Sequence, residues 1–153
     1  MLRFLILTTA ALACGACASI PDRMMMPVSA PANGATQVPI LVATTRQAVP
    51  NNPGMMFSGD RASTVSYAAV TISVPPNSVR TAGQIQWPAA TPANPLREFV
   101  TTSANYIDKS EFSSAITRAT QTGHKRVLVF VHGFNNRFDE AVFRFAQIVQ
   151  DSN

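Results

Sequence analysis

The sequence contains few charged residues and no extended cluster of positive charge. Only 13% of its 153 residues are charged, well below the roughly 25% usual in soluble domains. The 12 lysines and arginines outnumber the 8 acidic residues and give a net charge of +4, but only Lys125 and Arg126 are adjacent. Nucleic-acid binding depends on clustered cations that release counterions from the phosphate backbone. We therefore expect no nucleic-acid partner.

Cysteine is almost absent, because Cys14 and Cys17 are the only two and both lie in an apolar leader. Arg3, the apolar residues after it and the small residues that follow predict a signal peptide over residues 1–18. The apolar part is shorter than the ~20 residues that span a bilayer. Cleavage can follow Ala13 or Ala18, whereas Cys17 resembles the lipidated cysteine of a bacterial lipoprotein. We expect an exported protein that is either periplasmic or lipid-anchored to the bacterial envelope, without a structural disulfide.

Proline is missing from the second part of the chain, since all 11 prolines lie between Pro21 and Pro95. Residues 19–38 are rich in Pro, Ala, Asn and Met without periodicity, which predicts a flexible tether. Consecutive methionines at 24–26 are a poor cage for copper(I), although thioethers favour that ion. The remaining candidate metal ligands, whose spacing matches no ligand motif, are His124, His132, Asp139 and Glu140. We expect no metal and no cofactor.

The residues from 39 onward predict an α/β fold that opens with antiparallel strands. Apolar, β-branched runs predict paired strands over 40–46 and 66–74, and the second run alternates between a buried and a solvent-exposed face. Shorter extended pieces are expected over 83–88 and 98–103. Asp108 and Glu111 have the spacing of a capping box, so a helix is expected to begin there.

A run of apolar residues without alternation, Val127–Val131, follows that helix. This pattern predicts a parallel strand that helices cover on both faces. We expect residues 126–131 to be the most buried segment of the protein. A second helix is predicted to begin near Phe138, where Asn135 or Asn136 can cap it, and it carries a wide apolar face.

The loop between this strand and the second helix has the sequence His132-Gly133-Phe134-Asn135-Asn136. Ligands of open α/β sheets bind outside the carboxyl ends of the strands. Gly133 permits a sharp turn and close approach of a ligand. The helix behind the loop should present unpaired N–H groups to the same space, where they would stabilise an oxyanion.

Residues 125–135 resemble the third strand and following loop of an α/β-hydrolase. The wider sequence resembles the bacterial α/β-hydrolase family of unknown function over most of residues 38–152. The stretches that carry this resemblance are Val42–Arg46, Phe57–Arg61, Ser66–Pro76, Gly83–Pro88 and His132–Asn135.

The resemblance implies that the backbone N–H of Phe134 belongs to an oxyanion hole, with Gly133 permitting the turn and His132 shaping the loop. A role of His132 as general base conflicts with the order of the triad in this fold, where nucleophile, acid and base all follow the loop. The sequence contains no Gly-x-Ser-x-Gly, and Ser58 lacks the leading glycine. We therefore expect residues 39–153 to be the N-terminal part of the fold, truncated before the nucleophile elbow, with no catalytic triad residue present.

Two functions are compatible with these features. The first is the N-terminal fragment of an exported serine hydrolase of esterase or lipase type, which acts on a small ester-like substrate when complete and is inactive alone. The alternative is a non-enzymatic envelope lipoprotein that binds a partner or a small ligand. We favour the fragment, because a strand apolar on both faces has no later parallel neighbour in this sequence.

Overall fold

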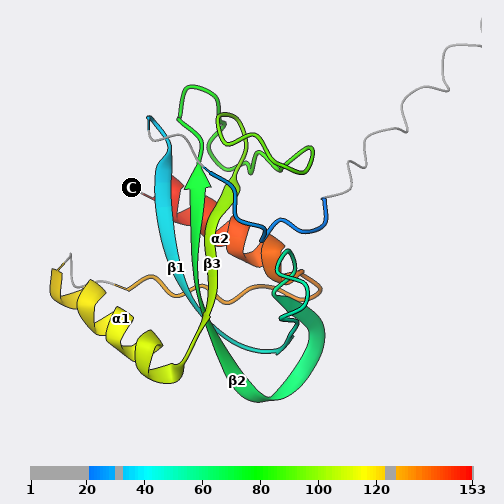
Figure 1. Ribbon diagram of the computed structural model, residues 1–153. Helices are drawn as coiled ribbons and strands as arrows, with labels where there is room; N and C mark the ends of the chain where they lie inside the picture. The colour runs from blue at the N-terminus through cyan, green and yellow to red at the C-terminus, as the bar shows by residue number, and fades with distance from the viewer. Residues whose placement is uncertain (1–20, 30–32, 123–126, 153) are drawn as a thin grey trace, which may run out of the picture.

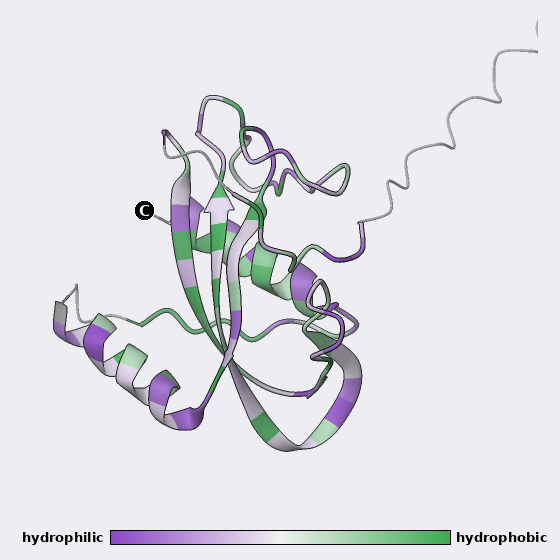
Figure 2. Ribbon diagram, in the orientation of Figure 1, coloured by the Kyte–Doolittle hydropathy of each residue, from purple (hydrophilic) through white to green (hydrophobic). Residues whose placement is uncertain are grey.

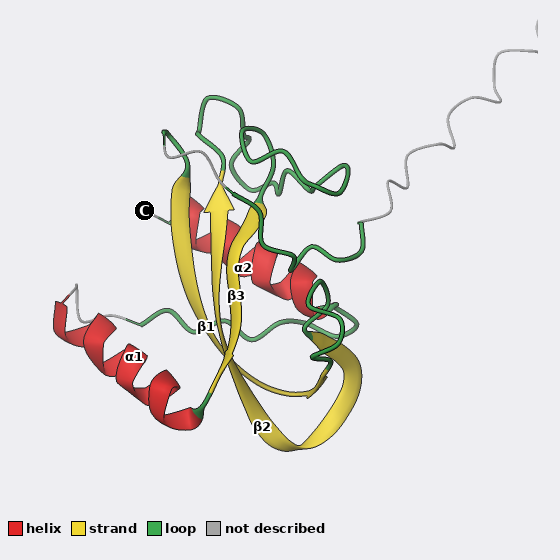
Figure 3. Cartoon of the chain, in the orientation of Figure 1, coloured by secondary structure: helices red, strands yellow, loops and turns green. Residues whose placement is uncertain are grey.

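The computed structural model describes residues 21–29, 33–122 and 127–152. Within them the element order is β1 (Thr36–Ala48), β2 (Phe57–Val74), β3 (Val100–Ile107), α1 (Lys109–Thr122) and α2 (Phe138–Asp151). The strands form an antiparallel sheet in the order β1-β2-β3, and the helices pack against it (Figures 1 and 3). This is a partial α/β arrangement, as expected from the sequence. Among the described residues, no helix has the length and apolar character needed to cross a membrane.

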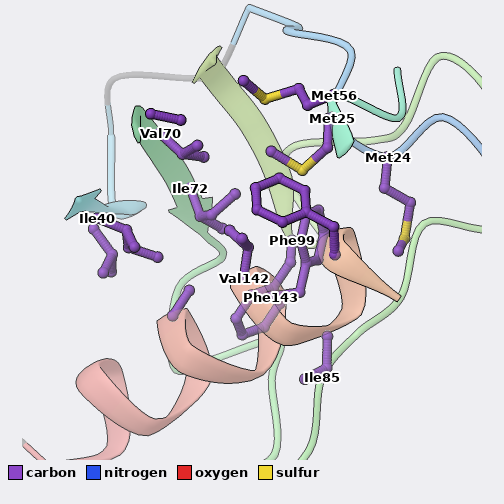
Figure 4. Packing of buried hydrophobic residues seen from close by; sticks show 14 of the residues in the cluster. Met24, Met25, Ile40, Met56, Val70, Ile72, Ile85, Phe99, Val142 and Phe143 are labelled. Carbon is purple, nitrogen blue, oxygen red and sulfur yellow. The ribbon is translucent and has the colours of Figure 1, made fainter. Parts of the chain in front are cut away.

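The predicted pairing of the first two strands is confirmed, and it creates the apolar face of the sheet. Val38 lies opposite Ile72 and Ile40 opposite Val70, and all four side chains are buried. The apolar side of α2 covers this face, as the hydropathy colours of Figure 2 and the close-up in Figure 4 show. Phe143 of α2 is completely buried. The core therefore lies between α2 and the β1–β2 ladder.

Helix α1 contacts the other face of β2. The Tyr67 ring lies 4.8 Å from the Phe112 ring of α1, and Tyr67 alternates with the buried Ala68. The predicted capping box is confirmed, because Asp108 Oδ1 accepts the Glu111 N–H at 2.8 Å and Glu111 Oε2 accepts the Asp108 N–H at 2.8 Å. The hydrogen bond from the Glu111 N–H lowers the pKa of Asp108, with a smaller contribution from Ser110.

The long connection between β2 and β3 packs against α2 at the core. Residues 83–88 form no strand, but Ile85 is buried and the Trp87 ring stacks on Phe143 with centroids 5.9 Å apart. Arg80 forms an ion pair with Asp151 at the end of α2, and the Gly83 N–H donates to the same carboxylate at 2.7 Å. These contacts attach an irregular, proline-rich connection to a regular helix.

The expected tether differs from the structure over residues 21–28. Met24 and Met25 are buried in the core. The Met25 N–H donates to the Gly54 carbonyl at 3.1 Å, and the Val28 N–H donates to the Thr101 carbonyl at 2.8 Å. This segment has no periodicity because its contacts are with distant parts of the chain rather than with a repeating face. The methionines serve as flexible apolar filler.

The expectation of a buried strand at 126–131 is wrong for the residues that the structure describes there. Residues 127–131 are an extended coil without strand pairing, and Val129 and Val131 are 77% and 85% exposed. Phe130 alone turns inward, and its ring stacks on Phe145 of α2 at 5.5 Å. A strand needs the backbone of a neighbour, and no described segment runs beside this one to provide it. Apolar character alone therefore does not bury it.

Candidate functional site

The loop His132–Asn136 lies on the surface between the exposed apolar segment and α2 (Figure 1). Phe134 is fully exposed, and within the described residues its backbone N–H has no acceptor. Asn135 adopts a left-handed φ of 59°, a conformation that asparagine tolerates better than most residues. The turn expected at Gly133 is therefore made at Asn135. A Cβ at Gly133 would meet only the Asn136 amide nitrogen at 3.9 Å, so the space beside Gly133 is open to a ligand.

His132 interacts with its own loop. Its Nδ1 lies 2.8 Å from the Gly133 carbonyl oxygen. Since a carbonyl only accepts, a hydrogen bond here requires a proton on Nδ1, and in the neutral imidazole this leaves Nε2 as an acceptor. The contact agrees with a loop-shaping role for His132 and brings it to no nucleophile.

Arg46 of β1 connects the loop to the sheet. Its Nη2 donates to the Asn136 carbonyl at 2.6 Å and its Nη1 to the Ser58 carbonyl at 3.3 Å. Two of the stretches that carry the family resemblance, Val42–Arg46 and Phe57–Arg61, thus meet at one guanidinium together with Asn136, the residue that follows a third. The side chain is half-buried, which favours a fixed geometry over a solvated one. Arg46 therefore holds the loop against the β1–β2 ladder.

The start of α2 is partly capped by the chain's own groups. Arg137, not an asparagine, precedes the helix. Glu140 Oε2 accepts the Arg137 N–H at 3.1 Å, and Asp139 Oδ1 accepts the Glu140 N–H at 3.0 Å. These carboxylates also neutralise the positive end of the helix dipole. Of the donors expected at this helix start, the Glu140 N–H is therefore engaged, and in the preceding loop the backbone N–H of Phe134 has no acceptor within the described residues.

Arg137 also fixes the beginning of the described chain. It donates to the Pro21 carbonyl at 3.0 Å and forms an ion pair with Asp22 at 3.1 Å. The hydrogen bond to the buried Asp139 carboxylate raises the pKa of Arg137, against the opposing effect of burial. The guanidinium therefore stays charged and ties residues 21–22 to α2.

No catalytic triad is assembled among residues 21–29, 33–122 and 127–152. Ser58 Oγ donates to Asp60 Oδ2 at 3.1 Å, and no imidazole contacts it. The same residues contain no group of three or more His, Cys, Asp or Glu side chains that could hold a metal ion. Cys17 and His124 lie outside the described residues. The site as described therefore offers hydrogen-bond donors and positive charge, and no nucleophile with its base.

A cavity of about 190 Å³ lies beside Arg137 rather than around Phe134. Its walls come mainly from two irregular segments, 21–28 and 88–93, with Val100 and Thr101 of β3. Most of these side chains are apolar. The cavity touches the site only through Pro21 and Asp22, which bind Arg137.

Sequence reasoning singled out the loop but not Arg46, which holds it, or Arg137, which binds residues 21–22 beside it. Arg46 could have been noticed as the only charged residue of the stretch Val42–Arg46. Arg137 stands directly before the acidic first turn of α2, where a cation is an unusual neighbour of the positive helix end. Neither signal identifies the partner, because Pro21, Ser58 and Asn136 are distant in the sequence.

Comparison with known proteins agrees with the resemblance seen in the sequence. Residues 108–153 match the family described as alpha/beta hydrolase of unknown function (DUF900). The matched part begins at the residue that caps α1 and includes the His132–Asn136 loop and α2. Curated proteins and solved structures gave no match.

Proposed function

From the match of residues 108–153 to an α/β-hydrolase family, we propose that this chain is the N-terminal part of an exported serine hydrolase of esterase or lipase type. In this proposal the chain contributes the oxyanion-hole loop and no triad residue. The observation that carries it is the backbone N–H of Phe134, which is exposed and lacks an acceptor within the described residues. Arg46 holds that loop in place.

The loop would act on the carbonyl oxygen of an ester. When a nucleophile attacks the carbonyl carbon, negative charge develops on the oxygen, and a preorganised N–H at Phe134 stabilises it. His132 keeps the loop in shape through its contact with the Gly133 carbonyl. The nucleophile, the acid and the base come from residues that this chain does not contain.

The exposed apolar segment 127–131 supports the idea that further strands complete the sheet. Val127, Leu128, Val129 and Val131 are all more than half exposed, and monomeric proteins rarely leave such contiguous apolar surface uncovered. Neighbouring strands would bury these side chains and pair the free backbone. Export through residues 1–18, with a lipid on Cys17, remains part of the proposal and concerns residues outside those described.

The test compares the 153-residue chain with the same chain extended by the residues that its gene encodes after Asn153. We expect the short chain to hydrolyse p-nitrophenyl acetate no faster than background, and the extended one to turn it over. In the extended protein, Phe134→Pro removes the N–H and should lower kcat by about 100- to 1,000-fold, the usual effect of losing one oxyanion-hole donor. The matched control Phe134→Ala keeps the N–H and should stay within a few-fold of the parent.

Two results would contradict the proposal. Equal loss of activity in both variants would assign the effect to the phenyl ring. Turnover by the short chain, blocked by a serine-directed phosphonate, would show that it contains a nucleophile, and Ser58 would be examined first.

The cavity beside Arg137 favours a second candidate function, a non-enzymatic envelope lipoprotein that binds a small ligand. Its apolar walls at 21–28 and 88–93 suit an apolar molecule of a few heavy atoms. This candidate takes precedence if the extended chain shows no turnover while the short chain unfolds in one cooperative transition.

A further inference from the structure

We infer that Arg46 and Arg61 form a binding site for an anionic group, a carboxylate or a phosphate, next to the His132–Asn136 loop. The site lies where the lower part of the β1–β2 ladder meets the start of α2 (Figure 1). Phe57 of β2 and Phe138 of α2 are in ring contact there, with centroids 4.7 Å apart. The inference rests on the proposed function only for the role of the loop. Its test measures binding and does not require catalytic turnover.

The two arginines are cross-strand partners. Arg46 of β1 pairs with Arg61 of β2 in the antiparallel register. Directly opposed residues of an antiparallel pair project from the same face, and like charges in these positions destabilise the pair. On β1, this is the face that also carries Val38 and Ile40 and that α2 covers. The chain thus places two positive charges side by side at the edge of the region that contains the loop.

Neither charge is neutralised within the described residues. Arg46 and Arg61 take part in no ion pair there, and Arg61 makes no side-chain hydrogen bond. The nearest acid in the sequence, Asp60, accepts a hydrogen bond from Ser58 Oγ and forms no ion pair with either arginine within the described residues.

The other acids around the loop already have partners. Asp22, Asp139 and Glu140 are all engaged by Arg137. An external anion is therefore the remaining source of compensating charge.

Arg46 has donors to spare. A guanidinium carries five N–H donors, and the two hydrogen bonds of Arg46 go to the carbonyls of Ser58 and Asn136. Those bonds fix the guanidinium plane, so little side-chain entropy remains to be lost when an anion binds. Arg61 is exposed and can swing onto the same anion. A fixed and a mobile arginine together can hold a carboxylate or phosphate by charge-assisted hydrogen bonds.

This arrangement specifies a class of ligand. The Asn136 carbonyl held by Arg46 is two residues from Phe134, whose N–H is free within the described residues. A molecule with its anionic group on the arginine pair can present a neutral carbonyl to the Phe134 N–H. The ligand we infer is therefore an ester or similar acyl compound with a carboxylate or phosphate group elsewhere in the molecule.

The experiment titrates the intact chain with three small probes and follows its backbone amides by NMR. Phenyl phosphate and benzoate carry the two anionic groups, and benzyl alcohol is the neutral control of similar shape. We expect saturable shifts at the amides of residues 58–61 and 134–136 with at least one anion and none with benzyl alcohol. Arg61→Gln should weaken binding of the anion at least tenfold, because it removes one of the two charged hydrogen-bond donors. Arg97→Gln removes an exposed arginine outside the site and should change the affinity less than twofold.

The comparison of variants decides the outcome. Equal weakening by Arg61→Gln and Arg97→Gln would show only a general effect of net charge and would overturn the inference. Shifts with benzyl alcohol at the same amides would likewise overturn it in favour of an apolar site. Arg46→Lys keeps the positive charge but removes the paired donors of the guanidinium, so it should weaken anion binding even though Arg61 is intact. The amide spectrum of this variant should remain that of a folded protein. Comparing the affinities of phenyl phosphate and benzoate shows whether the site prefers a phosphate or a carboxylate group.

Discussion

Single arginines connect segments of this protein that lie far apart in the sequence. Arg46 binds the carbonyl of Asn136, Arg80 binds the carboxylate of Asp151, and Arg137 binds the carbonyl of Pro21. Each of them attaches an irregular segment to a regular element. A guanidinium suits this purpose because it donates several hydrogen bonds in a fixed plane and keeps its charge when partly buried. Where the partner is a carboxylate, as Asp151 is for Arg80, the contribution of the arginine therefore depends on the ionisation of that partner.

Asp151 gives the clearest test of this dependence. The hydrogen bond from Arg80 lowers its pKa from 3.8 to about 2, aided by the Gly83 N–H and Gln147. Because the folded pKa is depressed, the stabilisation is present above the unfolded value near 3.8 and is lost as the pH falls towards 2. Asp151→Asn should lower the free energy of unfolding by about 1 kcal/mol at pH 7, after allowance for solvent screening.

Urea unfolding of the parent and of Asp151→Asn between pH 7 and pH 2 measures this effect. The difference in the free energy of unfolding between the parent and Asp151→Asn should become smaller below pH 4. Asp60→Asn is the control, since Asp60 makes no ion pair within the described residues. A difference that persists unchanged at pH 2 would show that the carboxylate charge is not what stabilises the contact.

Among the elements, α2 carries most of the packing. Its apolar face lies on the β1–β2 ladder, its core residue Phe143 stacks on Trp87, and Arg137 stands at its start. Helix α1, by contrast, contacts the sheet mainly through the ring pair Tyr67–Phe112. Loss of α2 packing should therefore unfold the whole described domain, whereas α1 is a lesser contributor.

Phe143→Ala tests the role of α2. Phe143 is fully buried and stacks on Trp87, so its truncation leaves a cavity and should cost about 3–5 kcal/mol of unfolding free energy. Phe134→Ala makes the same chemical change at a fully exposed position and should stay within about 0.5 kcal/mol. Urea unfolding followed by Trp87 fluorescence measures both. Similar costs at the two positions would contradict the packing described for α2.

At the scale of the whole molecule, the elements that the sequence predicted are those with local signals. The alternation of Val70, Ile72 and Val74 and the capping box at Asp108 reflect neighbours along the chain, and both are confirmed. The opposite face of β2 departs from the predicted alternation. Ser73, expected to be exposed, is also buried, and its Oγ has no partner within the described residues. The burial of Ser73 depends on which distant segments cover this face of the sheet, and a local sequence pattern does not contain that information.

The features that could not be predicted depend on distant neighbours. Met25 is buried where its N–H donates to the Gly54 carbonyl and where Thr101 of β3 donates to the neighbouring Met24 carbonyl, and nothing in the sequence around Met25 indicates this. The segment 127–131 has the composition of a buried strand but lacks an adjacent strand. The same division holds in the site, where the Phe134 loop was found from its own residues. Arg46 was missed as a functional residue because its partner Asn136 is 90 positions away.

The exposed segment leads to a prediction for the intact protein that amide hydrogen exchange can test. Within the described residues the backbone of 127–131 forms no backbone hydrogen bond, so its amides should exchange rapidly in the 153-residue chain. The paired amides at the centre of β2 should exchange through global unfolding and be the slowest. In the chain extended beyond Asn153, strands added beside 127–131 should slow its amides by several orders of magnitude. They would also bury the exposed valines, at about 25 cal/mol per Å² removed from water. Slow exchange of 127–131 in the short chain would mean that the segment is already paired, and continued rapid exchange in the extended chain would refute its assignment as an interior strand.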